Sequence, residues 1–351
     1  MSLVVTGDFH LGQFRNGPDI NGVNGRLLDI KARMWEMLDF LTKHQDASFM
    51  MVGDVFKDKH PSIPEMEVFA EFLRELIGLR ISSYFITGNH DSSKTVGQPH
   101  ALAPFMPLTQ GTCIRIIDEP AVLAGVGGEW AYFFPYKWHS QDEPLKKFTK
   151  DATSADPLFV HGTIEGGSVN KLVDYELFDE DVIQYDTVSK FRAVFAGHLH
   201  DEQHFKNVWY PGSIERLAFG DELSLKSFLT VTEQGDKLVV EKIPLNARKM
   251  VTMHYKQLEE LKVGKFSVKD AIVRISGVDR DHIRSTREAL MSAGCYYIAG
   301  LYTTEQETME LPKATGIDIS EFVRRLAVKT GYKGDVAGAT KIILETVENQ
   351  S

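Results

Sequence analysis

Three short apolar segments near the start of the chain each end in glycine followed by polar residues, and this pattern constrains the fold more than any other feature. Segments 3–6, 48–52 and 81–87 end in Gly7-Asp8, Gly53-Asp54 and Gly88-Asn89-His90-Asp91. Short apolar runs bounded by glycine are typical of buried strands. Ligands bind beyond the carboxyl ends of strands in α/β sheets, so we expect these three loops to converge on one site.

Amphipathic helices are predicted between these strands. Over residues 26–44, apolar side chains recur with the i, i+3, i+4, i+7 spacing of one helical face. A second helix is predicted over 64–78, because Pro64 favours a helix start and Gly78 favours a helix end. The alternation of strand and helix predicts an α/β fold for this part of the chain.

The middle of the chain is rich in candidate strands. They are 113–117, 121–125, 131–136, 157–161, 192–197, 204–210, 226–232 and 237–243. Residues 164–187 lie among them but are polar and acidic, so we predict a loop or lid there.

The pattern changes near residue 245. A strand over 271–276, a helix over 279–293 and a strand over 296–303 predict a small βαβ-like unit. A polar stretch follows, and then two helices are expected over 319–330 and 336–349. We therefore predict three parts, namely 1–245, 246–304 and 305–351.

The charge of the chain is unevenly distributed. The 351 residues carry a formal net charge of -10, yet residues 1–245 hold 23 Lys and Arg against 35 Asp and Glu, whereas 246–351 hold 16 against 14. The net charge therefore does not exclude a nucleic-acid partner, because contact can be local. Two isolated cysteines, the absence of a signal-like N-terminus and the absence of a long apolar run predict a cytoplasmic protein with no membrane partner.

Potential metal ligands follow the predicted strands in a fixed order. They are Asp8-x-His10, Gly53-Asp54, Gly88-Asn89-His90-Asp91, His161-Gly162 and Gly197-His198-x-His200. Residues at i and i+2 point the same way in extended backbone, so each such pair can address one metal cluster. Carboxylate, imidazole and amide oxygen together favour Mn, Fe or Zn. Two such ions, bridged by one carboxylate, can bind a phosphate and generate hydroxide.

This ordered set resembles the calcineurin-like metallophosphoesterase superfamily over residues 1–245. The resemblance implies a two-sheet α/β sandwich of the metallophosphoesterase type. It further implies one metal held by Asp8, His10, Asp54 and His200, and another held by Asp54, Asn89, His161 and His198. His90 would not be a ligand but a catalytic general acid that faces the phosphate.

Within the superfamily, the sequence is most similar to the SbcD-type nucleases and their phage recombination-endonuclease relatives. The segments that carry this similarity are GDFHLG, GDVFKDKHPS, GNHDSS, GHLHDEQ and YPGSIER. The resemblance implies a Mn²⁺-dependent DNA exonuclease or endonuclease of double-strand-break repair and recombination. It also implies a small α+β capping domain that positions DNA and a C-terminal helical segment that docks on an SbcC-type coiled-coil ABC ATPase.

Basic residues flank the predicted metal loops. Arg15, Lys57, Lys59 and Lys94 could contact DNA phosphates, or they could be ordinary solvated charges. The DNA could be a duplex end, a hairpin or a single strand, and a homodimer is left open.

Two other functions remain open from the sequence. The same metals could serve a phosphatase or cyclic-nucleotide phosphodiesterase, although the extra residues after 245 argue against a small substrate. A non-catalytic binding module could also use this fold, although the intact His90 and the full ligand set argue against it.

Overall fold

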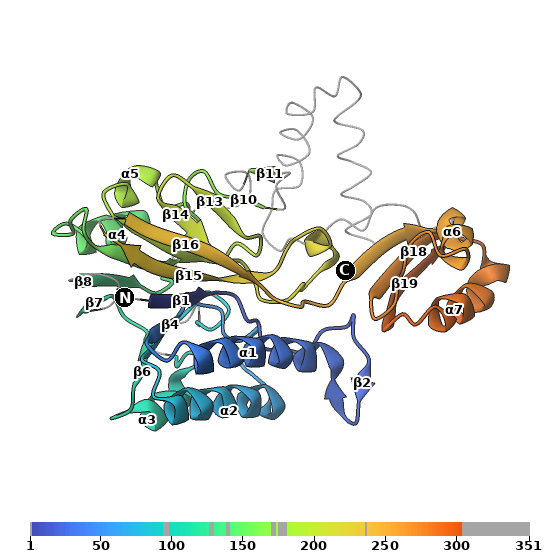
Figure 1. Ribbon diagram of the computed structural model, residues 1–351, viewed down its shortest axis with the longest axis horizontal. Helices are drawn as coiled ribbons and strands as arrows, with labels where there is room; N and C mark the ends of the chain where they lie inside the picture. The colour runs from blue at the N-terminus through green and yellow to red at the C-terminus, as the bar shows by residue number, and fades with distance from the viewer. Residues whose placement is uncertain are drawn as a thin grey trace, which may run out of the picture.

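Two six-stranded sheets form the body of the molecule (Figure 1). The computed structural model describes residues 2–93, 98–125, 130–137, 141–169, 173–174, 181–235 and 237–303. The first sheet runs in the order β16 (Lys237–Pro244), β15 (Ser227–Gln234), β1 (Ser2–Thr6), β4 (Ala47–Met51), β5 (Ser83–Ile86) and β6 (Ile114–Ile117). Its strands β1, β4, β5 and β6 are parallel. Strand β15 pairs antiparallel with β1, and β16 pairs antiparallel with β15.

In the second sheet the four central strands are parallel, and the strand at each edge is antiparallel to its neighbour. Its order is β13 (Gln203–Phe205), β14 (Val208–Tyr210), β12 (Ala193–Gly197), β9 (Pro157–His161), β8 (Trp130–Phe134) and β7 (Ala121–Ala124). The central strands β9 and β12 are buried along their whole length, and apart from the His161 that ends β9 they are apolar. Such continuous apolar runs are typical of parallel strands that are covered on both faces.

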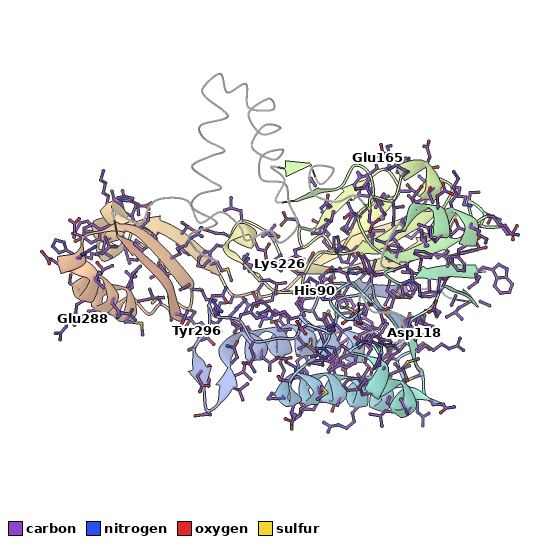
Figure 2. The ribbon with its side chains drawn as sticks, turned by 180° about the vertical axis from the view of Figure 1, so that it is seen from behind. His90, Asp118, Glu165, Lys226, Glu288 and Tyr296 are labelled. Atoms are coloured by element: carbon purple, nitrogen blue, oxygen red, sulfur yellow. The ribbon has the colours of Figure 1, made fainter. Side chains whose placement is uncertain are left out.

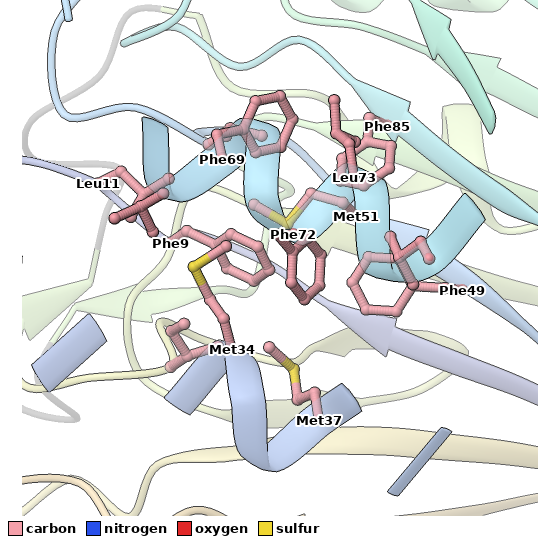
Figure 3. Close-up of a cluster of buried hydrophobic side chains, with 14 of the residues drawn as sticks. Phe9, Leu11, Met34, Met37, Phe49, Met51, Phe69, Phe72, Leu73 and Phe85 are labelled. Carbon is pink, nitrogen blue, oxygen red and sulfur yellow. The ribbon is translucent and has the colours of Figure 1, made fainter. Parts of the chain in front are cut away.

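Apolar side chains fill the space between the two sheets and cover their outer faces. Val5, Phe133 and Phe195 belong to the cluster that joins the sheets. A second cluster lies between the first sheet and the helices α1 (Gly25–Lys43) and α2 (Ile63–Leu79). Figure 3 shows Phe49, Phe72 and their neighbours in this cluster. Burying one phenylalanine contributes about 1.5–3 kcal/mol, so this layer fixes the helices firmly on the sheet.

The remaining small elements complete the body. They are the hairpin β2 (Asp19–Ile20) and β3 (Val23–Asn24), the hairpin β10 (Ser168–Val169) and β11 (Val173–Asp174), and the short helices α3 (Met106–Thr109), α4 (Asp142–Phe148) and α5 (Tyr185–Val188). The 3₁₀ turns η1 (Ala103–Phe105) and η3 (Phe219–Asp221) also lie here.

Helices α1 and α2 lie where the apolar spacing of 26–44 and the Pro64 and Gly78 signals predict them. Asn24 accepts a hydrogen bond from the amide of Arg26 at the start of α1. At α2, Glu65 accepts a hydrogen bond from the Ser62 amide. Helix α2 continues through Gly78 to Leu79 and is capped by Arg80, which adopts a left-handed conformation. The predicted stop at Gly78 is therefore about one residue early.

Two expectations for the middle of the chain need correction. Residues 204–210 were expected to form one strand but form the hairpin β13–β14, and Lys206 in its turn has a φ of 50°. A left-handed residue cannot continue a strand, and alternation of side chains does not reveal such a turn. Within the predicted loop 164–187, the described residues contain β10, β11 and the start of α5.

Residues 250–303, here called the capping module, form a separate three-stranded parallel sheet. Strands β17 (Met250–His254), β18 (Ile272–Val278) and β19 (Tyr297–Thr303) are covered by helices α6 (Leu258–Lys262) and α7 (Ile283–Ser292). The 3₁₀ turns η4 (Tyr255–Gln257) and η5 (Arg280–His282) precede the two helices. The predicted βαβ unit is confirmed, whereas β17 was not expected. The proposed division of the chain into three domains stays a prediction.

The predicted helices over 319–330 and 336–349 lie outside the described residues. Within the described part of the chain, no helix has the length and apolar character needed to cross a bilayer.

Candidate metal centre

The carboxyl ends of five strands meet at one place in the body. Asp8 follows β1, Asp54 follows β4, and the Asn89-His90 pair follows β5. From the second sheet, His161 ends β9 and the loop after β12 carries His198 and His200. The expected convergence is thus present in the structure, and both sheets contribute to it.

Backbone hydrogen bonds join the loops that carry these residues. The amide of Asp8 donates to the Gly53 carbonyl at 3.1 Å, and the amide of His10 donates to the Asp54 carbonyl at 3.0 Å. In the second sheet, the amide of Gly162 donates to the Gly197 carbonyl at 3.3 Å. The positions of the side chains are therefore set by the sheets and not by the loops alone.

Four of the candidate ligands have an unusual backbone. Asp8, His10, Asp54 and His198 have φ values of 52°, 48°, 57° and 101°, and they are half of the eight non-glycine residues with positive φ in the described chain. The expectation that the i, i+2 pairs are extended is therefore wrong for Asp8 and His10, and it is wrong at His198 in the second pair as well. Non-glycine residues in this region are strained and cluster at functional sites.

Three groups of side chains each bring potential metal ligands together, with their ligand atoms within 4.8 Å of one another. The groups are Asp8-His10-His200, His10-Asp54-His90 and Asp54-His161-His198. His198 and His200, although two residues apart, belong to different groups.

Asp54 lies between the groups. Its Oδ2 atom is 3.5 Å from His10 Nε2 and 3.4 Å from His161 Nε2. The Oδ1 atom of Asn89 lies 2.9 Å from both His161 Nε2 and His198 Nδ1. Asp54 is therefore in the position of a carboxylate that can bridge two sites.

Main-chain carbonyls orient two of the imidazoles. Nδ1 of His161 lies 2.8 Å from the Val52 carbonyl, and Nδ1 of His90 lies 2.9 Å from the Lys57 carbonyl. A carbonyl only accepts, so each Nδ1 carries a proton, and each Nε2 is left available to the centre. This second contact is typical of metal-binding histidines.

Burial and mutual charge set the protonation of the cluster. Burial disfavours the charged form of Asp54, but His161 and His10 outweigh it and lower the pKa of Asp54 below its usual range. Burial and the neighbouring His161 lower the pKa of His198 to about 3. Burial disfavours charged His161 as well, yet Asp54 and Asp8 raise the pKa of His161 to about 9.

The donor set fits divalent cations. Asp54 is ionised and His198 is neutral, which are the forms that bind metal. Carboxylate, imidazole and amide oxygen suit borderline ions such as Mn, Fe or Zn. The His and Asp clusters are consistent with two divalent metals.

Two supporting residues were not assigned a role from the sequence. The buried carboxylate of Asp91 accepts hydrogen bonds from the amides of Val55, Phe56 and Gly88, and so joins the Asp54 and His90 loops. The buried Lys226 donates to the His200 carbonyl at 2.9 Å. Asp91 is visible in the GNHD motif, whereas nothing around Lys226 in the sequence indicates its position.

The predicted phosphate-contacting residues differ in their surroundings. Lys57 Nζ donates to the Gln13 carbonyl at 2.6 Å and lies 4.3 Å from the centroid of the Phe14 ring. Arg15 is exposed and Lys59 is half-buried. Lys94 lies outside the described residues.

Comparisons with known proteins agree with this geometry. The calcineurin-like phosphoesterase family matches residues 1–202. The chain is a distant homologue of the SbcD component of the nuclease SbcCD from Staphylococcus epidermidis, with 26% identity over 296 residues, 78% of this chain and 74% of the relative.

Two solved structures are more remotely similar. A dimetal phosphatase from Danio rerio has a TM-score of 0.45 and 10% identity, with 69% of this chain and 95% of that chain covered. A 5'-nucleotidase precursor from Thermus thermophilus has a TM-score of 0.38 and 15% identity, with 70% and 54% covered.

The family match extends over more than half of the 351 residues and includes all five convergent strand ends. The chain therefore belongs to the calcineurin-like phosphoesterase family, and it is a metal-dependent phosphoesterase with a candidate dimetal site.

Proposed function

We propose that this protein is a Mn²⁺-dependent DNA nuclease. The observation that carries the proposal is the convergence of the full candidate ligand set and His90, in a chain that is homologous to an SbcD protein over most of its length. The basic balance of residues 246–303, with ten Lys and Arg against six Asp and Glu, favours a polyanionic substrate.

Seven residues are proposed as ligands of two ions. Asp8, His10, Asp54 and His200 would hold one ion, and Asp54, Asn89, His161 and His198 would hold the other. The shortest separations around Asp54 and Asn89 support this division. Ions bound there would supply Lewis-acid chemistry and a nucleophilic hydroxide at neutral pH.

His90 is proposed as the general acid. Its side chain is exposed, its amide donates to Asp54 Oδ1 at 2.9 Å, and its Nδ1 contacts the Lys57 carbonyl. These two contacts leave Nε2 to face a bound phosphate, where it can protonate the leaving sugar oxygen. Arg15, Lys57 and Lys59 could add contacts to the DNA backbone.

The biological setting is proposed from the homologue. Its name describes one component of a two-component nuclease, so we propose that this chain acts in double-strand-break repair and recombination with an SbcC-type ATPase. The C-terminal residues 305–351 are the proposed docking segment.

One assay tests the proposed reaction. Purified full-length protein with Mn²⁺ is incubated with labelled duplex DNA, with single-stranded DNA and with bis(p-nitrophenyl) phosphate. We expect hydrolysis of DNA and of the small ester. Hydrolysis of the small ester alone would instead identify a small-molecule phosphodiesterase, and no hydrolysis with metal bound would identify a binding module.

A further inference from the structure

The capping module and the two-sheet body meet through polar groups. The apolar core of the module contains residues between Val251 and Leu301 and includes none from the first 245 residues. An interface without a shared apolar core permits relative motion unless specific contacts prevent it. The contacts that join the two parts therefore decide where the module lies.

Arg248, just before β17, makes the most extensive of these contacts. Its Nε and Nη2 atoms donate to the two carboxylate oxygens of Asp29 on α1 at 2.8 and 2.6 Å. Its Nη1 donates to the Asp270 carbonyl at 3.0 Å, and its guanidinium lies 3.5 Å from the centroid of the Tyr296 ring. Figure 2 shows Tyr296 where the module meets the body. Arg248 thus contacts both parts at once.

Asp29 is held in turn from inside the body. Arg26, which is fully buried, donates to Asp29 Oδ2 and to the carbonyl of Arg216. Its guanidinium also lies 3.6 Å from Glu215. Because Arg26 holds the carboxylate from inside the body, Asp29 is a fixed partner for Arg248.

Segment 213–216, which contains Glu215 and Arg216, also supports the metal centre. Glu215 accepts a hydrogen bond from the Arg248 amide at 3.0 Å, and Arg216 donates to the Arg248 carbonyl at 3.2 Å. Two residues earlier, the amide of Ser213 donates to the carbonyl of His200 at 3.1 Å. Segment 213–216 therefore connects the module to a candidate ligand.

A second set of contacts lies at the first strand of the module. The amide of Thr252 on β17 donates to Glu222 at 2.9 Å, and the guanidinium of Arg274 on β18 lies 4.5 Å from the Phe219 ring centroid. These contacts act at a different point from Arg248, so together they define the orientation of the module.

We propose that Arg248 is a positioning residue, which fixes the capping module to α1 and segment 213–216 so that a polyanion bound at the metal centre also lies along the basic module. This inference rests on the proposed nuclease function and adds the residue that selects long substrates over short ones. Residues 1–245 carry an acidic excess, so a long anionic substrate gains its favourable charge contacts from the module only when the module is held in place.

The test compares Arg248→Met with Arg74→Met in the full chain. Arg74 on α2 is exposed and pairs with Glu75, so its substitution removes the same charge away from the module. Both variants are assayed with Mn²⁺ on a duplex oligonucleotide and on bis(p-nitrophenyl) phosphate. Amide hydrogen exchange is measured over residues 248–254.

We expect Arg248→Met to lower kcat/KM for the duplex at least tenfold, mainly through a higher KM. The kcat/KM for the small ester should change less than twofold. Exchange at the amides of Arg248 and Thr252 should become faster. Arg74→Met should leave all of these quantities unchanged within twofold. Arg248→Lys keeps the charge but lacks the paired donors, so it should restore duplex cleavage only in part.

Two outcomes would overturn the proposal. One is a duplex kcat/KM for Arg248→Met equal to that of Arg74→Met. The other is a parallel loss on both substrates by a folded variant, since that result would mean that Arg248 acts on the metal centre itself and not on the placement of long substrates. If Arg248→Met does not fold, Tyr296→Leu is used, and the same selective loss on the duplex is expected.

Failure of the nuclease function would look different. Wild-type protein would then hydrolyse the small ester and leave the duplex intact. In that case amide exchange decides the positioning role: faster exchange at Thr252 in Arg248→Met supports it, and unchanged exchange refutes it.

Discussion

At the scale of single residues, Asp54 organises the candidate centre. Its carboxylate lies between His10 and His161, and its Oδ1 accepts the amide of His90. One carboxylate therefore contacts both proposed metal positions and the proposed acid. Substitutions here should separate metal binding from the proton transfer step.

His90→Ala should retain two Mn²⁺ per chain but lose about 10²–10⁴-fold in DNA cleavage, because it removes a proton donor and not a proposed ligand. Asp54→Ala should lose both metal and activity. Metal content is measured by mass spectrometry and cleavage by initial rates. Wild-type cleavage by His90→Ala would refute its role, and loss of metal from that variant would make His90 a ligand, as its grouping with His10 and Asp54 allows.

The buried carboxyl of Glu215 should make the free energy of unfolding depend on pH. Burial raises the pKa of Glu215 even though Arg26 and two amides lower it. When folding raises the pKa of a carboxyl, that carboxyl stabilises the fold fully only at low pH. This stabilisation is lost as the pH rises through the pKa of the unfolded state, about 4.3, towards the pKa of the folded state.

The stability of the wild type relative to Glu215→Gln should therefore be greater at pH 4 than at pH 7. Each unit of raised pKa corresponds to about 1.4 kcal/mol. Urea unfolding of both metal-free proteins at the two pH values measures this difference. A difference that is constant with pH, or that grows towards pH 7, would contradict the expected burial effect.

At the scale of elements, the centre depends on how closely β4 and β12 approach each other at their carboxyl ends. A Cβ atom on Gly197, at the end of β12, would lie 2.0 Å from the Val52 carbonyl oxygen. Gly197 ends β12 and Val52 directly follows β4, so neither backbone can move away without disturbing a sheet. The two sheets can therefore approach here only because the residue is glycine.

Gly197→Ala should lower the free energy of unfolding by about 3 kcal/mol and weaken Mn²⁺ binding, because the two sheets must separate at the centre. Denaturant unfolding and metal titration measure the two effects. Gly78→Ala in α2 is the matched control, since apart from its adjacent residues and the backbone of its own helix no atom lies within 4 Å of its added methyl group. That control should be stabilising by about 1 kcal/mol.

At the scale of the whole molecule, an acidic body carries a basic module. Residues 1–245 have 12 more acidic than basic residues, whereas residues 246–303 have four more basic than acidic residues. Contact with DNA should then be confined to the metal centre, the few basic residues near it and the module.

Without metal, the isolated chain should bind duplex DNA weakly, with a Kd of about 10⁻⁵ M or weaker near physiological salt, and binding should weaken further as salt rises. Fluorescence anisotropy from 50 to 200 mM NaCl measures this dependence. Tight binding that persists in high salt without metal would mean a broad basic surface that the charge distribution does not supply.

The sequence alone determined the identity and order of the candidate ligands and the strands that carry them. Apolar runs and glycine-polar endings report local burial and chain reversal, so β1, β4, β5 and the helices between them could be predicted directly. The resemblance to the metallophosphoesterases then predicted a role for each of these side chains, because it rests on the order of the motifs along the chain.

Only the tertiary structure decided how these side chains meet. His10 and His200 are 190 positions apart, and Arg248 and Asp29 are 219 positions apart, yet each pair is in contact. The left-handed backbone at Asp8 and His10, the support from Asp91 and Lys226, and the polar junction at Arg248 all depend on packing between distant segments. Local periodicity contains no information about such contacts, because it reports which face of an element is buried and not which partner buries it.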